Sequence, residues 1–155
     1  SRFAAAIDQL LKKHGNVRVI ITGTKGEAHL AKEIQKNLST TSKRKVKSFA
    51  GQLNLEEFFA LAAEIKLFLS ADTGPMHIAA AQGARVLGLF GPNLPAIWAP
   101  YGKKNQTLYH KLWCSPCVIN DVHEEFPCIN KEYQQCMKLI SVEEVTPQIN
   151  KMIGL

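Results

Sequence analysis

The chain has 155 residues, 46% of them hydrophobic, which is enough for one well-formed core and too little to make two domains the expectation. Its 19 basic and 13 acidic residues give a formal charge of +6, so an anionic, phosphate-bearing partner fits the composition. No apolar run approaches the ~20 residues of a membrane-spanning helix, and the sequence therefore predicts a soluble protein.

Predicted helices and strands alternate from the first residues onward. Because a helical apolar pattern is already under way at Phe3, with no initiator Met or signal peptide before it, we expect a fragment of a longer protein. Asn54 and Glu57 form a capping-box pattern at the start of one of the helices. The expected elements are a helix through Leu11, strand 17–21, helix 28–37, strand 46–50, helix 55–63, strand 65–70, helix 75–82, strand 85–90, edge strand 106–109 and a terminal helix from 142.

This alternation predicts an α/β fold, a Rossmann-like parallel sheet with helices on both faces. Ligands of such sheets bind beyond the carboxyl ends of the strands. The turns that follow the predicted strands should therefore lie along one edge and hold the ligand. They are Gly23-Thr24, Gly51, Asp72-Thr73-Gly74 and Gly91-Pro92.

The segment from Asp72 to His77 carries the clearest binding chemistry. Pro75 suits the first turn of a helix, where unpaired amides and the positive end of the helix dipole attract an anion. Thr73 and His77 add hydrogen-bonding groups, and Gly74 lets a ligand approach the backbone. A carboxylate beside a diphosphate would be repelled, so we assign Asp72 to sugar hydroxyls or to amides of the turn. The alternative is that Asp72 and Thr73 only cap the helix and His77 is a satisfied, partly buried histidine.

Three segments together resemble glycosyltransferase family nine, the heptosyltransferases of lipopolysaccharide core synthesis. They are Gly51-Gln52-Leu53-Asn54-Leu55, the block from Leu69 through Asp72-Thr73-Gly74-Pro75-Met76-His77 to Ala81, and Leu89-Phe90-Gly91-Pro92. The resemblance extends over nearly the whole chain. It implies a GT-B fold, in which two Rossmann-like domains face each other across a cleft, and residues 1–155 resemble the C-terminal, donor-binding domain.

The resemblance also assigns roles to individual residues. Asp72, Thr73, Gly74 and His77 fall on positions that contact the diphosphate and sugar of the donor, typically ADP-heptose. Glu27 falls on the ribose position and Leu53 on the adenine position. Glu27 could equally be an exposed first-turn glutamate stabilised by the helix dipole. The strand-end residues Gly23 and Thr24 complete the candidate donor-binding set.

Parts of the family pattern are missing from this chain. In the family, a first strand, a glycine-containing loop and a phosphate-binding lysine precede the first helix, and the catalytic base belongs to the N-terminal domain. We therefore expect no catalytic residue here and no activity from the fragment alone. The resemblance implies that the whole enzyme is an inverting transferase that acts on a lipid-linked saccharide (lipid A-Kdo). We expect it in the cytoplasm, at the cytoplasmic face of the inner membrane, where it can contact lipid. We expect no nucleic-acid partner and no required cofactor.

Four cysteines leave a further question open. Cys114 and Cys117 have the spacing of a zinc knuckle, and Cys128 and Cys136 are placed singly, so a structural zinc site is a hypothesis beside disulfides and free thiols. His110 and His123 are substitute ligands. A zinc-knuckle module that binds nucleic acid is the alternative function, although the βα alternation already supplies a core without metal.

Overall fold

The computed structural model describes residues 1–118 and 127–154. The chain divides into two compact units, Ser1–Ala60 with Val142–Leu155 (unit 1) and Leu61–Ser141 (unit 2). Within the described residues, no helix has the length and apolar character needed to span a membrane. Both units are built from parallel strands and helices, so the predicted α/β class is confirmed.

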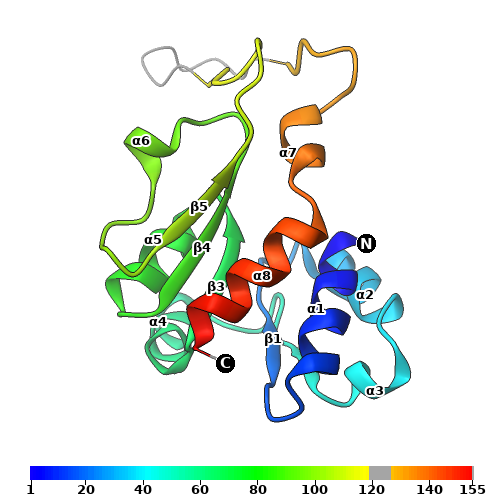
Figure 1. Ribbon diagram of the computed structural model, residues 1–155. Coiled ribbons are helices and arrows are strands. Elements are labelled where there is room, and N and C mark those ends of the chain that lie inside the picture. The colour runs from blue at the N-terminus through cyan, green and yellow to red at the C-terminus, as the bar shows by residue number, and fades with distance from the viewer. Residues whose placement is uncertain (119–126, 155) are drawn as a thin grey trace. The chain divides into compact units, whose positions relative to one another are not determined.

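Unit 1 contains a two-stranded parallel sheet and several helices. Strands β1 (Val19–Ile21) and β2 (Val46–Ser48) pair in register from Val19 opposite Val46. Helix α1 (Arg2–Lys13) packs beside α8 (Val142–Ile153), as Figure 1 shows. The remaining helices are α2 (Ala28–Lys36) and α3 (Thr40–Lys43), and α4 (Leu55–Glu64) begins in this unit.

The core of unit 1 forms because apolar residues of α1 and of the strands point to the same interior. Ala4, Leu11, Leu38 and Val46 are buried, and partly buried Ile and Val side chains pack against them. Close to this core, His14 Nε2 of the α1 C-terminus lies 2.8 Å from Asn150 Oδ1 of α8. The long helical patterns at the two ends of the chain thus stabilise one unit.

Unit 2 is a three-stranded parallel sheet in the order β3-β4-β5. Its central strand β4 (Arg85–Phe90) is buried from Val86 to Phe90, because it is covered on both faces. The buried core contains Val86 and Phe90 of this strand with Met76 and Ala79 of the neighbouring helix. The other elements are β3 (Leu67–Ala71), α5 (Gly74–Ala81), α6 (Pro95–Trp98), β5 (Gln106–Tyr109) and α7 (Gln135–Leu139).

The sequence predicted the long elements and missed the shortest. Helices α3 and α6 have only four residues each, too few to show a periodic apolar pattern. Within the described residues the strands form two sheets, β1-β2 and β3-β4-β5, whereas one parallel sheet was expected. The expectation that 1–155 forms one donor-binding domain stays a prediction.

Candidate functional site

The turn between β3 and α5 holds the predicted residues Asp72 to His77. The N–H of Asp72 donates to Leu89 O at 3.2 Å, which ties the start of the turn to β4. Thr73 is the N-cap residue by position, yet its side chain makes no capping hydrogen bond. Its Oγ1 instead donates to Ala71 O at 3.3 Å and lies 3.2 Å from Ser70 Oγ. The geometry therefore gives no support to the idea that Thr73 serves mainly as a helix cap.

Within the described part of the chain, the Gly74 backbone amide of this turn is free. No described residue accepts a hydrogen bond from Gly74 N–H, Pro75 has no N–H, and Met76 N–H is already paired with Thr73 O at 3.0 Å. The sequence predicted a whole turn of unpaired amides, and the pairing of Met76 reduces that number. Nothing lies within 4 Å of the position a Cβ would take on Gly74, so its surroundings are open. An anion can reach this amide at the positive end of the α5 dipole.

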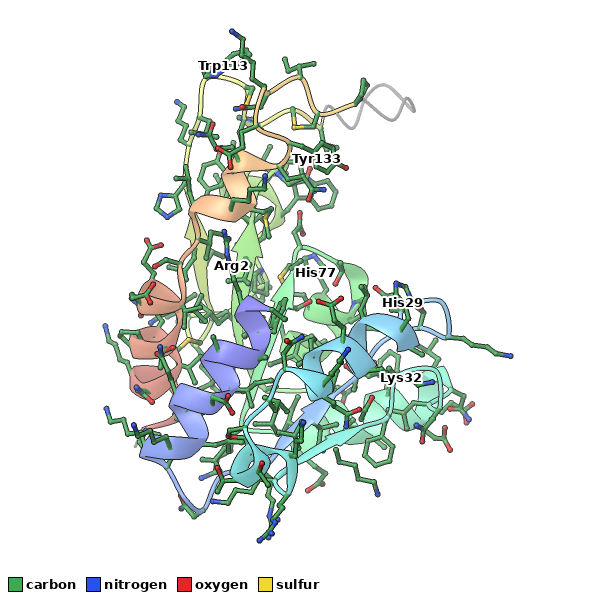
Figure 2. All side chains as sticks on the ribbon, turned by 90° about the vertical axis from the view of Figure 1, so that its right-hand side faces the viewer. Arg2, His29, Lys32, His77, Trp113 and Tyr133 are labelled. Carbon is green, nitrogen blue, oxygen red and sulfur yellow. The ribbon has the colours of Figure 1, made fainter. Side chains whose placement is uncertain are left out.

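His77 lies on the first turn of α5 and is exposed, as Figure 2 shows. The alternative of a satisfied, partly buried histidine does not describe it, because no described group bonds to its ring. An exposed imidazole three residues after Gly74 is free to donate to a ligand oxygen.

The Asp72 carboxylate has a partner that the sequence did not reveal. Asn93 Nδ2 donates to Asp72 Oδ2 at 2.5 Å, across 21 residues of sequence. No backbone amide of the described turn donates to the Asp72 side chain, which disfavours one of the two roles predicted for it. Asn93 follows directly after Gly91-Pro92, and a polar residue just past a strand-end turn is the signal that could have found it.

Unit 1 carries the Glu27 turn. Thr24 N–H and Thr24 Oγ1 both donate to Glu27 Oε2, at 2.8 and 2.7 Å. The hydrogen bond from the Thr24 backbone, reinforced by the one from its hydroxyl, lowers the pKa of Glu27 below the ordinary glutamate value. Both predicted residues are thus joined in one turn, and Oε1 of the carboxylate is left for another partner.

Leu53 lies in the loop that follows β2. The N–H of Gly51 donates to Gly23 O at 2.8 Å, so this loop and the Glu27 turn meet at the carboxyl ends of β1 and β2. Gly51 has φ +73°, and a Cβ there would lie 2.9 Å from Lys25 Cα, so only glycine fits without strain. Neither the N–H nor the C=O of Leu53 is hydrogen-bonded to any described residue. These backbone groups are available to the edge of a base.

The four cysteines lie in unit 2 as free thiols. Burial, followed by the proximity of the Cys136, Cys114 and Cys128 sulfurs, raises the pKa of Cys117. Two sulfurs accept weak hydrogen bonds, Cys114 from Asn130 Nδ2 at 3.4 Å and Cys128 from Gln134 N–H at 3.3 Å. Over the described ranges, no three His, Cys, Asp or Glu side chains are grouped to hold a metal, and His123 lies outside those ranges. Zinc stays a prediction.

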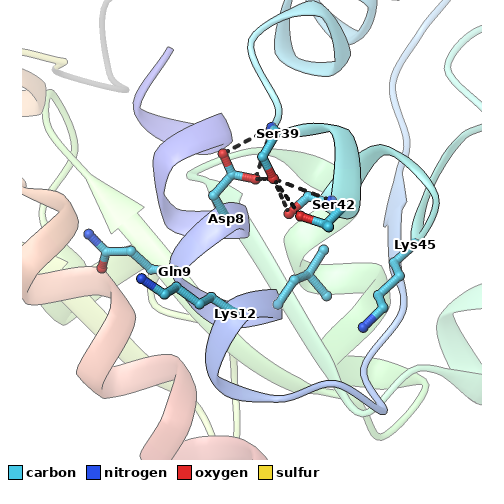
Figure 3. A pocket seen from close by; sticks show the side chains of 8 residues that line it. Asp8, Gln9, Lys12, Ser39, Ser42 and Lys45 are labelled. Atoms are coloured by element: carbon cyan, nitrogen blue, oxygen red, sulfur yellow. Dashed lines mark hydrogen bonds between the residues drawn. The ribbon is translucent and has the colours of Figure 1, made fainter.

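Two hollows of unit 1 lie away from these turns. One, of about 530 Å³, is drawn in Figure 3 and lies between α1 and α3. Burial opposes the charge of Asp8 there, but hydrogen bonds from Ser42 and Ser39 outweigh it and lower the pKa of Asp8. A second, of about 420 Å³, is lined by four basic residues, Arg18, Arg44, Lys45 and Lys47, together with apolar side chains. Neither contains a residue of the predicted donor set, so we do not assign the site to them.

Parallel strands whose carboxyl ends lead into polar, glycine-containing turns define a class, the Rossmann-like α/β proteins. Comparison with known proteins identifies the family within that class. Residues 1–126 match glycosyltransferase family 9 (heptosyltransferase), and the chain belongs to this family. Membership does not favour the alternative of a nucleic-acid-binding module.

Individual relatives agree with this assignment. The chain is 28% identical to the lipopolysaccharide core heptosyltransferase OpsX of Haemophilus influenzae over 149 residues, which cover 96% of the chain and 42% of the relative. It is 29% identical to lipooligosaccharide heptosyltransferase 2 of Campylobacter jejuni over 136 residues, covering 86% and 40%.

A solved structure supports the fold. The structure of Escherichia coli ADP-heptose lps heptosyltransferase II matches with a TM-score of 0.78 at 22% identity, over 98% of this chain and 40% of that one. The family nine glycosyl transferase of Veillonella parvula matches with a TM-score of 0.76 at 19% identity, also over 98% and 40%. The chain therefore spans about 40% of the length of these proteins.

Proposed function

We propose that the full-length protein carrying this chain is an inverting glycosyltransferase that transfers heptose from ADP-heptose to the lipopolysaccharide inner core. The acceptor in this proposal is a lipid A-Kdo saccharide held by a part of the protein outside residues 1–155. Family membership supports the class of reaction. The observation that carries the donor assignment is the β3–α5 turn, with its free Gly74 amide and open surroundings.

The donor contacts follow from the chemistry of each group. Negative charge builds on the departing diphosphate as the glycosidic bond breaks. In unit 2 that charge is stabilised by Gly74 N–H, by the α5 dipole and by His77. Thr73 adds a hydroxyl. Asp72 accepts from sugar hydroxyls, because its acceptor character would repel the phosphates.

The nucleoside contacts are proposed for unit 1. Glu27 Oε1 accepts from ribose hydroxyls, since Oε2 is occupied by Thr24. The free backbone groups of Leu53 pair with the adenine edge. The catalytic base that deprotonates the acceptor hydroxyl is assigned to the part of the protein outside this chain. The acceptor carries a lipid, so the proposal places the reaction at the cytoplasmic face of the inner membrane, where free thiols also fit the reducing compartment.

Calorimetric titration of the full-length protein with ADP, UDP and GDP tests the donor assignment. ADP should bind most tightly, and His77→Ala should weaken it by about tenfold, equivalent to one lost hydrogen bond to a charged group. The matched control is Lys66→Ala, an exposed residue that precedes β3 at its opposite, amino end. Absence of binding by all three nucleotides would overturn the assignment.

A further inference from the structure

Asn93 lies in a turn that the rest of unit 2 holds firmly. Ser115, which is 5% exposed, donates from Oγ to Gly91 O at 2.5 Å, and its Oγ lies 3.1 Å from Tyr109 OH. The N–H of Cys117 donates to Pro92 O at 2.9 Å. A Cβ on Gly91 would lie 2.6 Å from Met137 Sδ, so the turn packs closely against α7. The turn that presents Asn93 is therefore fixed before any ligand binds.

The side-chain amide of Asn93 has one hydrogen-bonded atom, Nδ2, and one atom without a described partner, Oδ1. Its Nδ2 donates to Asp72 Oδ2 at 2.5 Å, while its Oδ1 is buried and has no hydrogen-bond partner among the described residues. The orientation follows from charge, since the reversed amide would set a carbonyl oxygen against a carboxylate. A buried acceptor without a partner lowers stability, so stability alone does not account for an asparagine at this position.

We infer that Asn93 is a positioning residue that holds the Asp72 carboxylate in the orientation in which it accepts from the hydroxyls of the donor sugar. Because Asn93 occupies Oδ2, the carboxylate is fixed about its last torsion and its other oxygen, Oδ1, is directed to a single place. This inference rests on the proposed function and adds a residue that contacts Asp72 rather than the donor. The inference concerns the transferred heptose, so the binding of ADP, which lacks that heptose, should not depend on Asn93.

The first test measures the binding of ADP and of ADP-heptose to the full-length protein and to two asparagine variants of it. Asn93→Ala should weaken the binding of ADP-heptose by about tenfold and leave the binding of ADP unchanged, because only the contact with the heptose is lost. Its thermal midpoint should change little, since the unpaired Oδ1 disappears with the side chain. The control is Asn105→Ala, because Asn105 accepts from Val86 N–H at 2.9 Å and donates to Tyr101 O at 2.6 Å. It should lower the thermal midpoint without changing the ratio of the two affinities.

The second test uses pH. In Asn93→Asp two carboxylates are adjacent, and their repulsion raises the pKa at which the pair takes up a shared proton. Below that pKa a protonated Asp at 93 can donate to Asp72 as the amide does. The kcat/KM of Asn93→Asp relative to the native protein should therefore rise as pH falls from 8 to about 5, whereas the same ratio for Asn93→Ala should stay flat.

The outcomes separate this inference from the proposed function. If the native protein binds no ADP-heptose, the proposed function fails and the role of Asn93 fails with it. If the native protein binds ADP-heptose and Asn93→Ala binds it equally well, only the role of Asn93 is overturned. An equal loss of ADP and ADP-heptose affinity, together with a lower thermal midpoint, would show that Asn93 supports the fold instead.

Discussion

Thr24 and Glu27 show how a residue proposed to contact the donor is also held by its own turn. Both hydrogen bonds from Thr24 converge on Oε2, so the carboxylate is charged and oriented before a ribose is present. Asp72 is held in the same way by Asn93. In each case the protein engages one carboxylate oxygen, an arrangement that would preorganise the proposed donor contacts.

Glu27→Gln should remove the pH dependence that the Glu27 carboxylate gives to the stability of this turn. The folded-state pKa of Glu27 lies below its ordinary value of 4.5, so its stabilising effect is complete above pH 4.5 and is lost as pH falls through the folded pKa. The native protein should have the higher thermal midpoint at pH 7, by the equivalent of at most about 1 kcal/mol at this exposed position. The difference should shrink below about pH 4.5.

Thermal unfolding of the two proteins from pH 3.5 to 7, roughly the range over which a glutamate titrates, would measure this effect. Glu33→Gln is the matched control, because Glu33 is exposed on α2 and no described group bonds to its carboxylate. A difference between native protein and Glu27→Gln that stayed constant with pH would show that the charge of Glu27 is irrelevant to the turn.

At the scale of elements, the start of α4 is fixed by a reciprocal pair of hydrogen bonds. Asn54 N–H donates to Glu57 Oε2 and Glu57 N–H donates to Asn54 Oδ1, each at 2.8 Å. This confirms the capping box expected from the sequence. Because Leu53 immediately precedes Asn54, the capping box also fixes the backbone that we propose for adenine recognition.

Asn54→Ala should lower the stability by about 1 kcal/mol, as loss of an N-cap side chain commonly does. Glu57→Ala should lower the stability by less than Asn54→Ala does. The double variant should lose less stability than the sum of the two single variants, because the two hydrogen bonds are coupled in one capping box. Thermal midpoints of the three variants measure this coupling, with Glu56→Ala, an exposed first-turn residue, as the control. Strict additivity would contradict the capping box.

At the scale of the whole molecule, the chain spans about 40% of its relatives, and the proposed reaction needs groups from outside it. We expect residues 1–155 expressed alone to release no ADP from ADP-heptose in the presence of acceptor, because neither the base nor the acceptor site is included. The full-length protein should release ADP, and Asp72→Ala should reduce that rate. Turnover by the isolated chain within about tenfold of the full-length rate would overturn the assignment of the base to another part.

Local patterns were sufficient for the long elements and for the turns that follow the strands. The apolar periodicity of 3–11 and 142–153 predicted α1 and α8, and the Asp72-Thr73-Gly74-Pro75 sequence predicted a strand-to-helix turn, because the causes lie within a few residues. The i to i+3 bond between Thr24 and Glu27 is equally local. Thr73 takes the N-cap position of α5, but its hydroxyl bonds to Ala71 O and makes no capping hydrogen bond.

The sequence by itself determined the class of fold, the family and the residues of the β3–α5 turn, because each depends on neighbouring residues or on a recognisable motif. Only the tertiary structure decided that Asn93 orients Asp72, since strands β3 and β4 must pair before residues 21 apart can meet. It also decided that Ser115, which lies in a loop without an apolar periodicity, donates a hydrogen bond to Gly91 O in the Gly91-Pro92 turn. Contacts of that kind are properties of the packed chain, and no local pattern encodes them.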